Sequence, residues 1–271
     1  MHKIQRESDN NQQHQFCLMS DLHWDNPKCR RDLLAKDLEH CKTHGIPILM
    51  NGDLFCAMEG RHDRRRSRNI MPDHNSLSYY DNLVNDAVRY FQPYAHLIEL
   101  VGYGNHETSV LRNGETDLLK RFCAGIGRAQ ALGGYGGWFR ISLKYKKGKD
   151  CQHFNLKYYH GSGGGGIITK GTIAQQRMLS MIDGADAIWM GHVHEGLVMH
   201  NVKERIRTSG KVELAPVLQI RTPTYKEEYG EGKMGWHVER GAPPKPLGCY
   251  ILELTYNQKR PIIADAFALR C

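Results

Sequence analysis

Apolar and polar residues come in regular blocks along the first hundred residues of the chain. Three short apolar runs have the length of buried strands and occupy residues 15–20, 46–51 and 96–101. The segments between them, 28–44 and 76–92, repeat apolar residues every three or four positions, as amphipathic helices do. This strand–helix–strand–helix–strand order predicts a largely parallel sheet covered by helices.

Each expected helix has an apolar side and a recognisable end. The first would bury Leu34, Leu38 and Cys41, and Gly45 stands where a helix commonly ends on a glycine. Pro93 would end the second helix, because proline cannot continue it. The apolar side of that second helix consists of Leu77, Tyr80, Val84, Ala87 and Phe91.

The pattern changes after residue 130, where strand-like segments dominate. Residues 138–145 and 152–159 have the character of neighbouring strands, and 185–190 is another short apolar run. The last third, about 196–270, is mostly strand-like and is broken by glycine and proline. Together with the first half, this pattern predicts an α/β protein whose strands are parallel to mixed.

The motifs of one candidate site, described below, occur in both halves of the chain. A single domain is therefore expected over residues 15–271, preceded by a polar N-terminal arm over 1–14. Residues 221–246 are rich in glycine, proline and charge, and this segment is long for a loop without regular structure. We expect it to serve as a lid or as a partner surface.

The composition narrows the class of protein. Apolar residues make up 40% of the 271 residues and charged residues 24%, which is ordinary for a globular protein and excludes disorder over most of the chain. No run of 18 apolar residues is present, and the polar N-terminus lacks the apolar stretch of a secretory signal. We therefore expect a cytoplasmic protein without membrane contact, with its eight cysteines as free thiols.

Fifteen histidines are present, and five of them lie in short polar motifs. Most of these motifs directly follow an apolar strand. The five motifs are Asp21-Leu22-His23, Gly52-Asp53, Gly104-Asn105-His106-Glu107, His160-Gly161 and Gly191-His192-Val193-His194. Because the carboxyl ends of parallel strands open on one edge of a sheet, residues far apart in the sequence are expected to converge there.

The residue types in these motifs are those of a metal site. Carboxylate, imidazole and amide oxygen donors suit borderline divalent ions such as Mn, Fe, Zn, Co or Ni. In Asp-x-His and His-x-His the two outer residues point to the same side of an extended chain, so both can reach one ion. The set holds more ligands than one tetrahedral zinc takes, which favours two ions about 3.5–4 Å apart that share a carboxylate. Polar loops without any ligand would explain a single motif, but they do not explain five in this order.

As a set, the motifs resemble those of the calcineurin-like metallophosphoesterases. The family pattern is D-x-H, G-D, G-N-H-[DE], H and G-H-x-H, and all five blocks occur here in that order over about residues 16–195. The resemblance implies a metallophosphoesterase-type two-sheet mixed β-sandwich flanked by helices. It also implies a hydrolase of phosphoester bonds, nearest to bacterial or phage-encoded members of the family.

The resemblance further assigns roles to individual residues. One ion would be held by Asp21, His23, Asp53 and His194, and the other by Asp53, Asn105, His160 and His192, with Asp53 bridging. His106 matches the family histidine that binds no metal, faces the scissile phosphate and protonates the leaving oxygen. Glu107 would orient this loop from behind the ligands, or it would be purely structural. The cofactors implied are two divalent ions, with Mn²⁺ expected to serve in vitro and Fe, Zn, Co or Ni also compatible with the ligands.

The substrate class is less clearly marked. The protein phosphatases of the family extend the second block to G-D-x-x-D-R-G, and this chain lacks that Asp-Arg pair, which disfavours a protein substrate. The run Gly-Asp-Leu-Phe at 52–55 looks more like the block of SbcD-type nucleases. This likeness and the basic net charge slightly favour DNA or RNA. Small phosphate esters or nucleotides, and an inactive binding scaffold of the same fold, stay as alternatives. The oligomeric state is not indicated.

Half of the net charge of +8 falls in eight residues after the second motif. The run 61–68 contains one aspartate and five arginines, Arg61, Arg64, Arg65, Arg66 and Arg68. Arginine binds phosphate groups bidentately, so this run is a candidate contact for a nucleic-acid backbone. A solvated loop that keeps the protein in solution is an equally good interpretation of the same residues.

Overall fold

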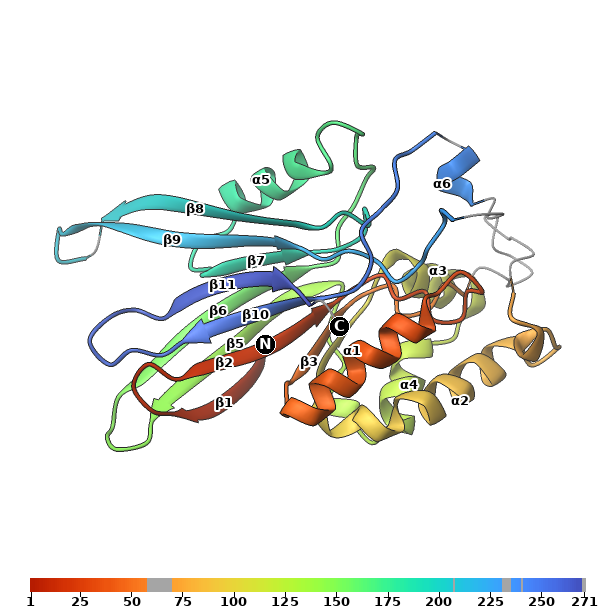
Figure 1. The fold of residues 1–271 in the computed structure, drawn as a ribbon, viewed down its shortest axis with the longest axis horizontal. Helices are drawn as coiled ribbons and strands as arrows, with labels where there is room; N and C mark the ends of the chain where they lie inside the picture. Colours follow the sequence, from red (N-terminus) through yellow and green to blue (C-terminus); the bar gives the residue numbers. More distant parts are fainter. Residues whose placement is uncertain (58–69, 207, 231–234, 240, 270–271) are drawn as a thin grey trace.

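Two mixed β-sheets lie face to face, with helices against their outer sides (Figure 1). The computed structural model describes residues 1–57, 70–206, 208–230, 235–239 and 241–269. The strand order is β1–β5–β6–β7–β9–β8 in one sheet and β11–β10–β2–β3–β4 in the other. The observed architecture is therefore α/β with two mixed sheets, as the sequence predicts at this level of detail.

The five-stranded sheet contains the strands expected in the first half of the chain. Its members are β2 (Gln13–Met19), β3 (Ile48–Asn51), β4 (Ile98–Gly102), β10 (Tyr250–Thr255) and β11 (Ile263–Ala268). Strands β2, β3 and β4 are parallel to one another, which confirms the predicted parallel group. Strands β10 and β11 extend the sheet in antiparallel pairing from the far end of the chain.

The six-stranded sheet combines the later strands with the N-terminus. Its members are β1 (His2–Ser8), β5 (Gly136–Tyr145), β6 (Cys151–Tyr159), β7 (Ala187–Met190), β8 (Leu197–Ile206) and β9 (Val212–Arg221). Strands β6, β7 and β9 are parallel, whereas β5 pairs with β6, and β8 with β9, in antiparallel fashion.

The prediction of a polar N-terminal arm over residues 1–14 is wrong. Residues 2–8 form β1, which pairs in parallel with β5 at the edge of the six-stranded sheet, and β2 begins at Gln13. Only Ile4 and Ser8 of β1 are buried, so an edge strand of this kind needs almost no apolar sequence. The polar composition concealed it for that reason.

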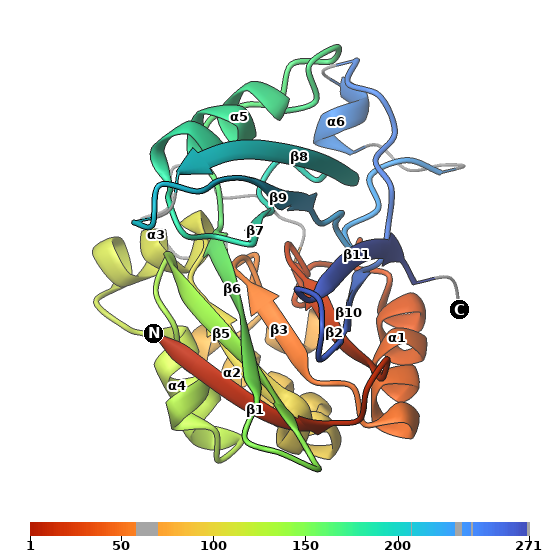
Figure 2. The same ribbon diagram turned by 90° about the vertical axis from the view of Figure 1, so that its left-hand side faces the viewer.

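Helices cover both outer faces of the sandwich (Figure 2). Helices α1 (Arg31–His44), α2 (Tyr79–Phe91) and α4 (Leu118–Gly125) pack on the five-stranded sheet, and α5 (Thr172–Met181) packs on the six-stranded sheet. The shorter or more peripheral elements are α3 (Asn105–Gly114), α6 (Trp236–Glu239), η1 (Pro72–His74), η2 (Gln92–Leu97) and η3 (Ala129–Ala131).

The two predicted helices are confirmed with one correction. Leu34, Leu38 and Cys41 are buried on α1, which ends at Gly45 with a left-handed φ of 63°. On the expected side of α2, Val84, Ala87 and Phe91 are buried and Tyr80 is half-buried, but Leu77 is 95% exposed. Leu77 lies before the first residue of the helix, so the helical periodicity does not apply to it.

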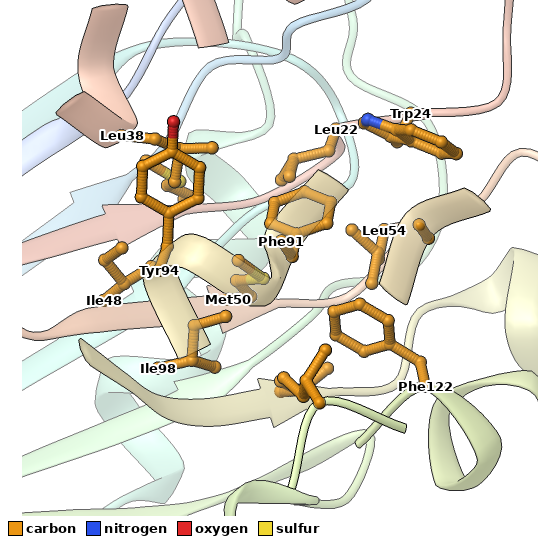
Figure 3. Close-up of a cluster of buried hydrophobic side chains, with 14 of the residues drawn as sticks. Leu22, Trp24, Leu38, Ile48, Met50, Leu54, Phe91, Tyr94, Ile98 and Phe122 are labelled. Carbon is orange, nitrogen blue, oxygen red and sulfur yellow. The ribbon is translucent and has the colours of Figure 1, made fainter. Parts of the chain in front are cut away.

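Strands β3 and β4 and the second half of β2 are buried on both faces, which explains why their sequences are almost continuously apolar. On β2, Cys17 and Met19 pack toward the helices, whereas Leu18 packs between the sheets. Leu22 and Leu54, from the loops that follow β2 and β3, join the helix-side core (Figure 3). The loops that carry the candidate site are therefore anchored in the core through residues between the polar ones.

No helix in the described part of the chain is both long and apolar enough to cross a membrane. The seven cysteines that the structure describes are all unpaired, and six of them are buried.

Candidate metal centre

The five motifs converge where the carboxyl ends of the parallel strands in the two sheets meet. Each motif follows a different strand, namely β2, β3, β4, β6 and β7. Main-chain hydrogen bonds join the loops, since Asp21 N–H donates to Gly52 O and Gly191 N–H donates to His160 O. The structure brings together all seven residues expected as ligands, Asp21, His23, Asp53, Asn105, His160, His192 and His194.

The seven residues form two adjacent groups. In the first, His194 Nε2 lies 3.2 Å from His23 Nε2 and 3.4 Å from Asp21 Oδ1. In the second, His160 Nε2 lies 3.2 Å from Asp53 Oδ2.

Asn105 completes the second group. Its Oδ1 lies 3.3 Å from His160 Nε2 and 2.8 Å from His192 Nδ1. The groups approach each other at His160 Nε2 and Asp21 Oδ1, which are 4.0 Å apart.

These spacings suit divalent metal ions. Two donors that each lie about 2.1 Å from one ion are separated by roughly 3.0–3.4 Å in octahedral or tetrahedral geometry. The contacts within each group fall close to that range. The donor set therefore fits two ions.

The imidazoles of the second group are held as metal-binding histidines usually are. His160 Nδ1 lies 2.8 Å from Asn51 O, and His192 Nε2 lies 2.9 Å from Gly163 O. A backbone carbonyl accepts a hydrogen bond from the N–H of one ring nitrogen, so the lone pair of the other nitrogen faces the centre. In each ring the nitrogen that faces the group is thus the one free to act as a ligand.

The carboxylates in and beside the second group favour a positive charge between them. Burial disfavours a charged imidazole, but the adjacent carboxylates of Asp53 and Asp21 raise the pKa of His160 to about 10. The same imidazole, together with His106, holds the pKa of Asp53 well below its ordinary value, although burial acts in the opposite direction. A proton on His160 and a divalent ion between these donors meet the same need for positive charge.

Backbone strain marks the same residues independently of their chemistry. Positive φ angles are uncommon outside glycine, and strained residues tend to cluster at functional sites. Among the residues that the structure describes, nine non-glycine residues have positive φ. Five of these nine are expected ligands, namely Asp21, His23, Asp53, His192 and His194. The sharp turns after the strands are therefore concentrated at the residues that carry the candidate chemistry.

The glycines of the motifs allow the loops to meet. A methyl group on Gly104 would collide with the carboxylate and the backbone nitrogen of Asp53. Gly52 has a φ of 81°, and a side chain there would collide with His160 and Gly104. The Gly-Asp and Gly-Asn-His-Glu motifs thus need glycine because two loops and an imidazole pack together at that point.

His106 lies at the edge of the cluster in the first turn of α3. Its backbone N–H donates to Asp53 Oδ1 at 3.0 Å, so the helix N-terminus supports the charge of that carboxylate. Its Nδ1 lies 2.6 Å from Cys56 O, and its Nε2 lies 3.8 Å from Asp53 Oδ2. The side chain keeps 12% of its surface exposed, whereas Asp53 keeps 3%. His106 is therefore more accessible to solvent than Asp53, as His194 is at 11%.

Glu107 supports the loop that carries Asp53. Its carboxylate accepts hydrogen bonds from the backbone N–H groups of Asp53, Phe55 and Gly104 at 2.9–3.1 Å. Burial and the neighbouring Asp53 raise the pKa of Glu107 to about 8. Glu107 thus ties the loop after β3 to the N-terminus of α3.

Asp25 was not expected from the sequence, yet it has a similar position on the other side of the loop. It is buried, and its carboxylate accepts the N–H groups of Cys56 at 2.5 Å and Ala57 at 2.9 Å and the hydroxyl of Tyr79 at 3.2 Å. Cys56 in turn presents its carbonyl to His106. The only sequence signal was an additional acidic residue two positions after His23 in the first motif.

Residues at the end of β9, far along the chain, hold the loops that carry two of the motifs in place. Ser20 Oγ donates to Asp21 Oδ2 at 2.5 Å and lies 2.7 Å from Thr222 Oγ1. Arg221 is buried and donates to Gly191 O at 3.1 Å and Gly171 O at 3.0 Å. Burial lowers the pKa of Arg221 to about 10. These residues hold the loops that carry Asp21 and His192. No short sequence motif predicts this role.

Two further predictions concern segments near the site, the arginine-rich run 61–68 and the segment 221–246. The basic residues Arg61, Arg64, Arg65, Arg66 and Arg68 lie outside the described residues. The segment 221–246 does not begin as an exposed lid, because Thr222, Thr224 and Tyr225 are buried and Thr224 Oγ1 donates to Asp21 O at 2.7 Å. Its first part is instead a supporting layer behind the first group of donors.

Comparison with known proteins gives little further information. No protein-family model matches the chain, and no curated protein matches it. One solved structure that matches is described as "GAP50 the anchor in the inner membrane complex of Plasmodium", with 12% identity over 94% of this chain and 84% of that chain, and a TM-score of 0.43. A likeness this distant supports no conclusion about this chain.

Proposed function

We propose that this protein is a dinuclear metal-dependent phosphoester hydrolase with a fold of the calcineurin-like metallophosphoesterase type. The observation that supports the proposal is the convergence of five sequence motifs into two adjacent groups of metal donors. Asp21, His23 and His194 would hold one ion, and Asn105, His160 and His192 the other. Asp53 would bridge them. When bound, two such ions neutralise phosphate oxygens and lower the pKa of an attacking water to about 7.

His106 would protonate the leaving oxygen. Because Nδ1–H donates a hydrogen bond to Cys56 O, a second proton on this ring is carried by Nε2. That atom is on the side of the ring near Asp53, where a phosphate group bridging the two donor groups would lie. General acid catalysis by a positioned histidine of this kind needs no covalent intermediate with the protein.

The complete donor set favours a hydrolase over an inactive scaffold. A degenerate member of the family would have lost ligands or the acid histidine, and here the seven donors and His106 are all present and clustered. Nucleic acid is the favoured substrate class on the basis of the +8 net charge, half of it at residues 61–68. Small phosphate esters or nucleotides are the competing class.

The proposal is tested by a substrate panel at saturating Mn²⁺. We expect release of p-nitrophenol from bis-p-nitrophenyl phosphate, loss of this activity on chelation, and its return when Mn²⁺ is added back. Single- and double-stranded DNA and RNA, next to a set of nucleotides, identify the substrate class. Hydrolysis of nucleotides without degradation of any polymer would reject the nuclease assignment, and no metal-dependent hydrolysis of any ester would reject the proposed function.

Asp25 is expected to act on catalysis through the position of His106. In Asp25→Asn, one of the two acceptor oxygens for Cys56 and Ala57 becomes an amide donor, so the carbonyl that holds His106 shifts. We expect kcat to fall about 10- to 100-fold, as is typical for loss of a supporting carboxylate, with KM and the content of two metals unchanged.

The matched control for this variant is Asp32→Asn, which removes an exposed carboxylate paired with Arg30. Steady-state kinetics and metal analysis by mass spectrometry measure both variants. A loss of metal in Asp25→Asn in proportion to the loss of kcat would show that Asp25 supports the ligands and not His106.

A further inference from the structure

Cys56 belongs to a third group of donor atoms beside the two already described. One ring nitrogen each of His23 and His106 and the sulfur of Cys56 all lie within 4.8 Å of one another. The group shares His23 with the first set of donors, but neither Cys56 nor His106 belongs to the seven expected ligands. It is the one donor group, among those in the described residues, that contains a thiol.

The sulfur is held in place by the loop around it. Asp25 fixes the backbone of Cys56 and Ala57, and Ala57 has a strained φ of 47°. Asn26 Nδ2 donates to Cys56 Sγ at 3.4 Å, and the side chain of Cys56 is buried. The thiol is thus held by two neighbouring side chains, those of Asp25 and Asn26, and does not lie free in solvent.

His23 can serve this group as well as the first. Its Nε2 lies beside His194 Nε2, as described above. Its Nδ1 is buried and has no hydrogen-bond partner within the described part of the chain. Buried polar atoms without partners are rare, and one at a cluster of metal donors is a reason to look for a ligand.

The chemistry of the group differs from that of the other two. Thiolate sulfur with two imidazoles selects thiophilic ions such as Zn²⁺ and Cd²⁺, whereas carboxylate and amide oxygens suit Mn²⁺. We propose that Cys56, His106 and His23 form a separate site for a thiophilic divalent ion. Three protein ligands leave one position of a tetrahedral ion for water or substrate.

Occupation of this site would inhibit hydrolysis, and this part of the inference rests on the proposed function. An ion bound to His106 takes up the ring that would protonate the leaving oxygen. The enzyme would therefore be active with Mn²⁺ and inhibited when a thiophilic ion is added to the Mn²⁺-loaded protein.

Binding is tested with Cd²⁺ on the full-length, Mn²⁺-saturated protein, by the ultraviolet charge-transfer absorption of a cadmium–thiolate bond. We expect this absorption to be lost in Cys56→Ser and kept in Cys151→Ser, which removes an exposed thiol and serves as the matched control. His106→Gln leaves the thiol in place and should weaken Cd²⁺ binding, so the inference does not depend on how Cys56→Ser folds. Equal absorption in the wild type and Cys56→Ser would overturn it.

Inhibition is tested by titrating Zn²⁺ into the hydrolysis assay at saturating Mn²⁺, with each variant normalised to its own uninhibited rate. Half-inhibition of Cys56→Ser should require at least about tenfold more Zn²⁺ than that of the wild type or Cys151→Ser. Equal inhibition of all three would overturn the inhibitory role and leave the proposed function intact. Cd²⁺–thiolate absorption without any hydrolysis would instead reject the proposed function and keep the site.

Discussion

Replacing Asp53 by Asn should remove at least one metal ion per chain and reduce turnover by more than about 100-fold. Loss of a supporting group around a metal ligand costs roughly 10–100-fold, and a ligand shared by two ions should cost more. Asp53 is buried, contacts His160 Nε2 at 3.2 Å and accepts the N–H of His106 at 3.0 Å. Asparagine keeps the size of this side chain but removes the charge that would hold the ions.

Metal content by mass spectrometry and hydrolysis of bis-p-nitrophenyl phosphate measure this effect. Asp32→Asn is the matched control, because it makes the same chemical change at an exposed carboxylate outside the site. Asp53→Asn should keep its fold, as measured by circular dichroism, since the neighbouring core residue Leu54 is unchanged. Two ions per chain and wild-type turnover in Asp53→Asn would contradict the bridging role.

The parallel core of the fold could be predicted because its strands are buried on both faces. The runs around β2, β3 and β4 are apolar at nearly every position, so their length and flanking polar residues mark them clearly. The edge strand β1 could not be predicted, since its exposed positions are free to be polar. Helix α3 could not be predicted either, because it begins at Asn105, within a polar motif whose sequence is typical of a loop.

The donor residues could be predicted because metal chemistry restricts their types and spacing. The order of the motifs, each after a strand, was enough to place residues such as Asp21 and His192 in one cluster. The residues that hold the donor loops in place could not be predicted in this way. Thr222 contacts Ser20 only because the end of β9 in one sheet meets the end of β2 in the other, and that meeting is set by the whole fold. No local pattern encodes such a contact.

The backbone provides a test of the donor set that chemistry alone does not. A left-handed conformation at an aspartate or histidine costs free energy, of the order of 1–3 kcal/mol, unless the surroundings hold it in place. Here Glu107 accepts the backbone N–H of Asp53, and Ser20 donates to the carboxylate of Asp21, which supports these two turns. The folded structure thus maintains strain at the turns that carry donors, which is expected where a geometry serves ligand binding.

His106→Ala should reduce turnover by about 10²- to 10⁴-fold, the range for loss of a general acid, while two ions stay bound. The loss should be greater with an alkyl diester than with bis-p-nitrophenyl phosphate, because p-nitrophenolate leaves without a proton and an alkoxide does not. His200→Ala, which removes an exposed imidazole paired with Asp265, is the matched control and should retain wild-type rates. Metal analysis separates a lost acid from a lost ligand. Full activity in His106→Ala, or an equal loss on both esters, would show that the proton comes from another group at the centre.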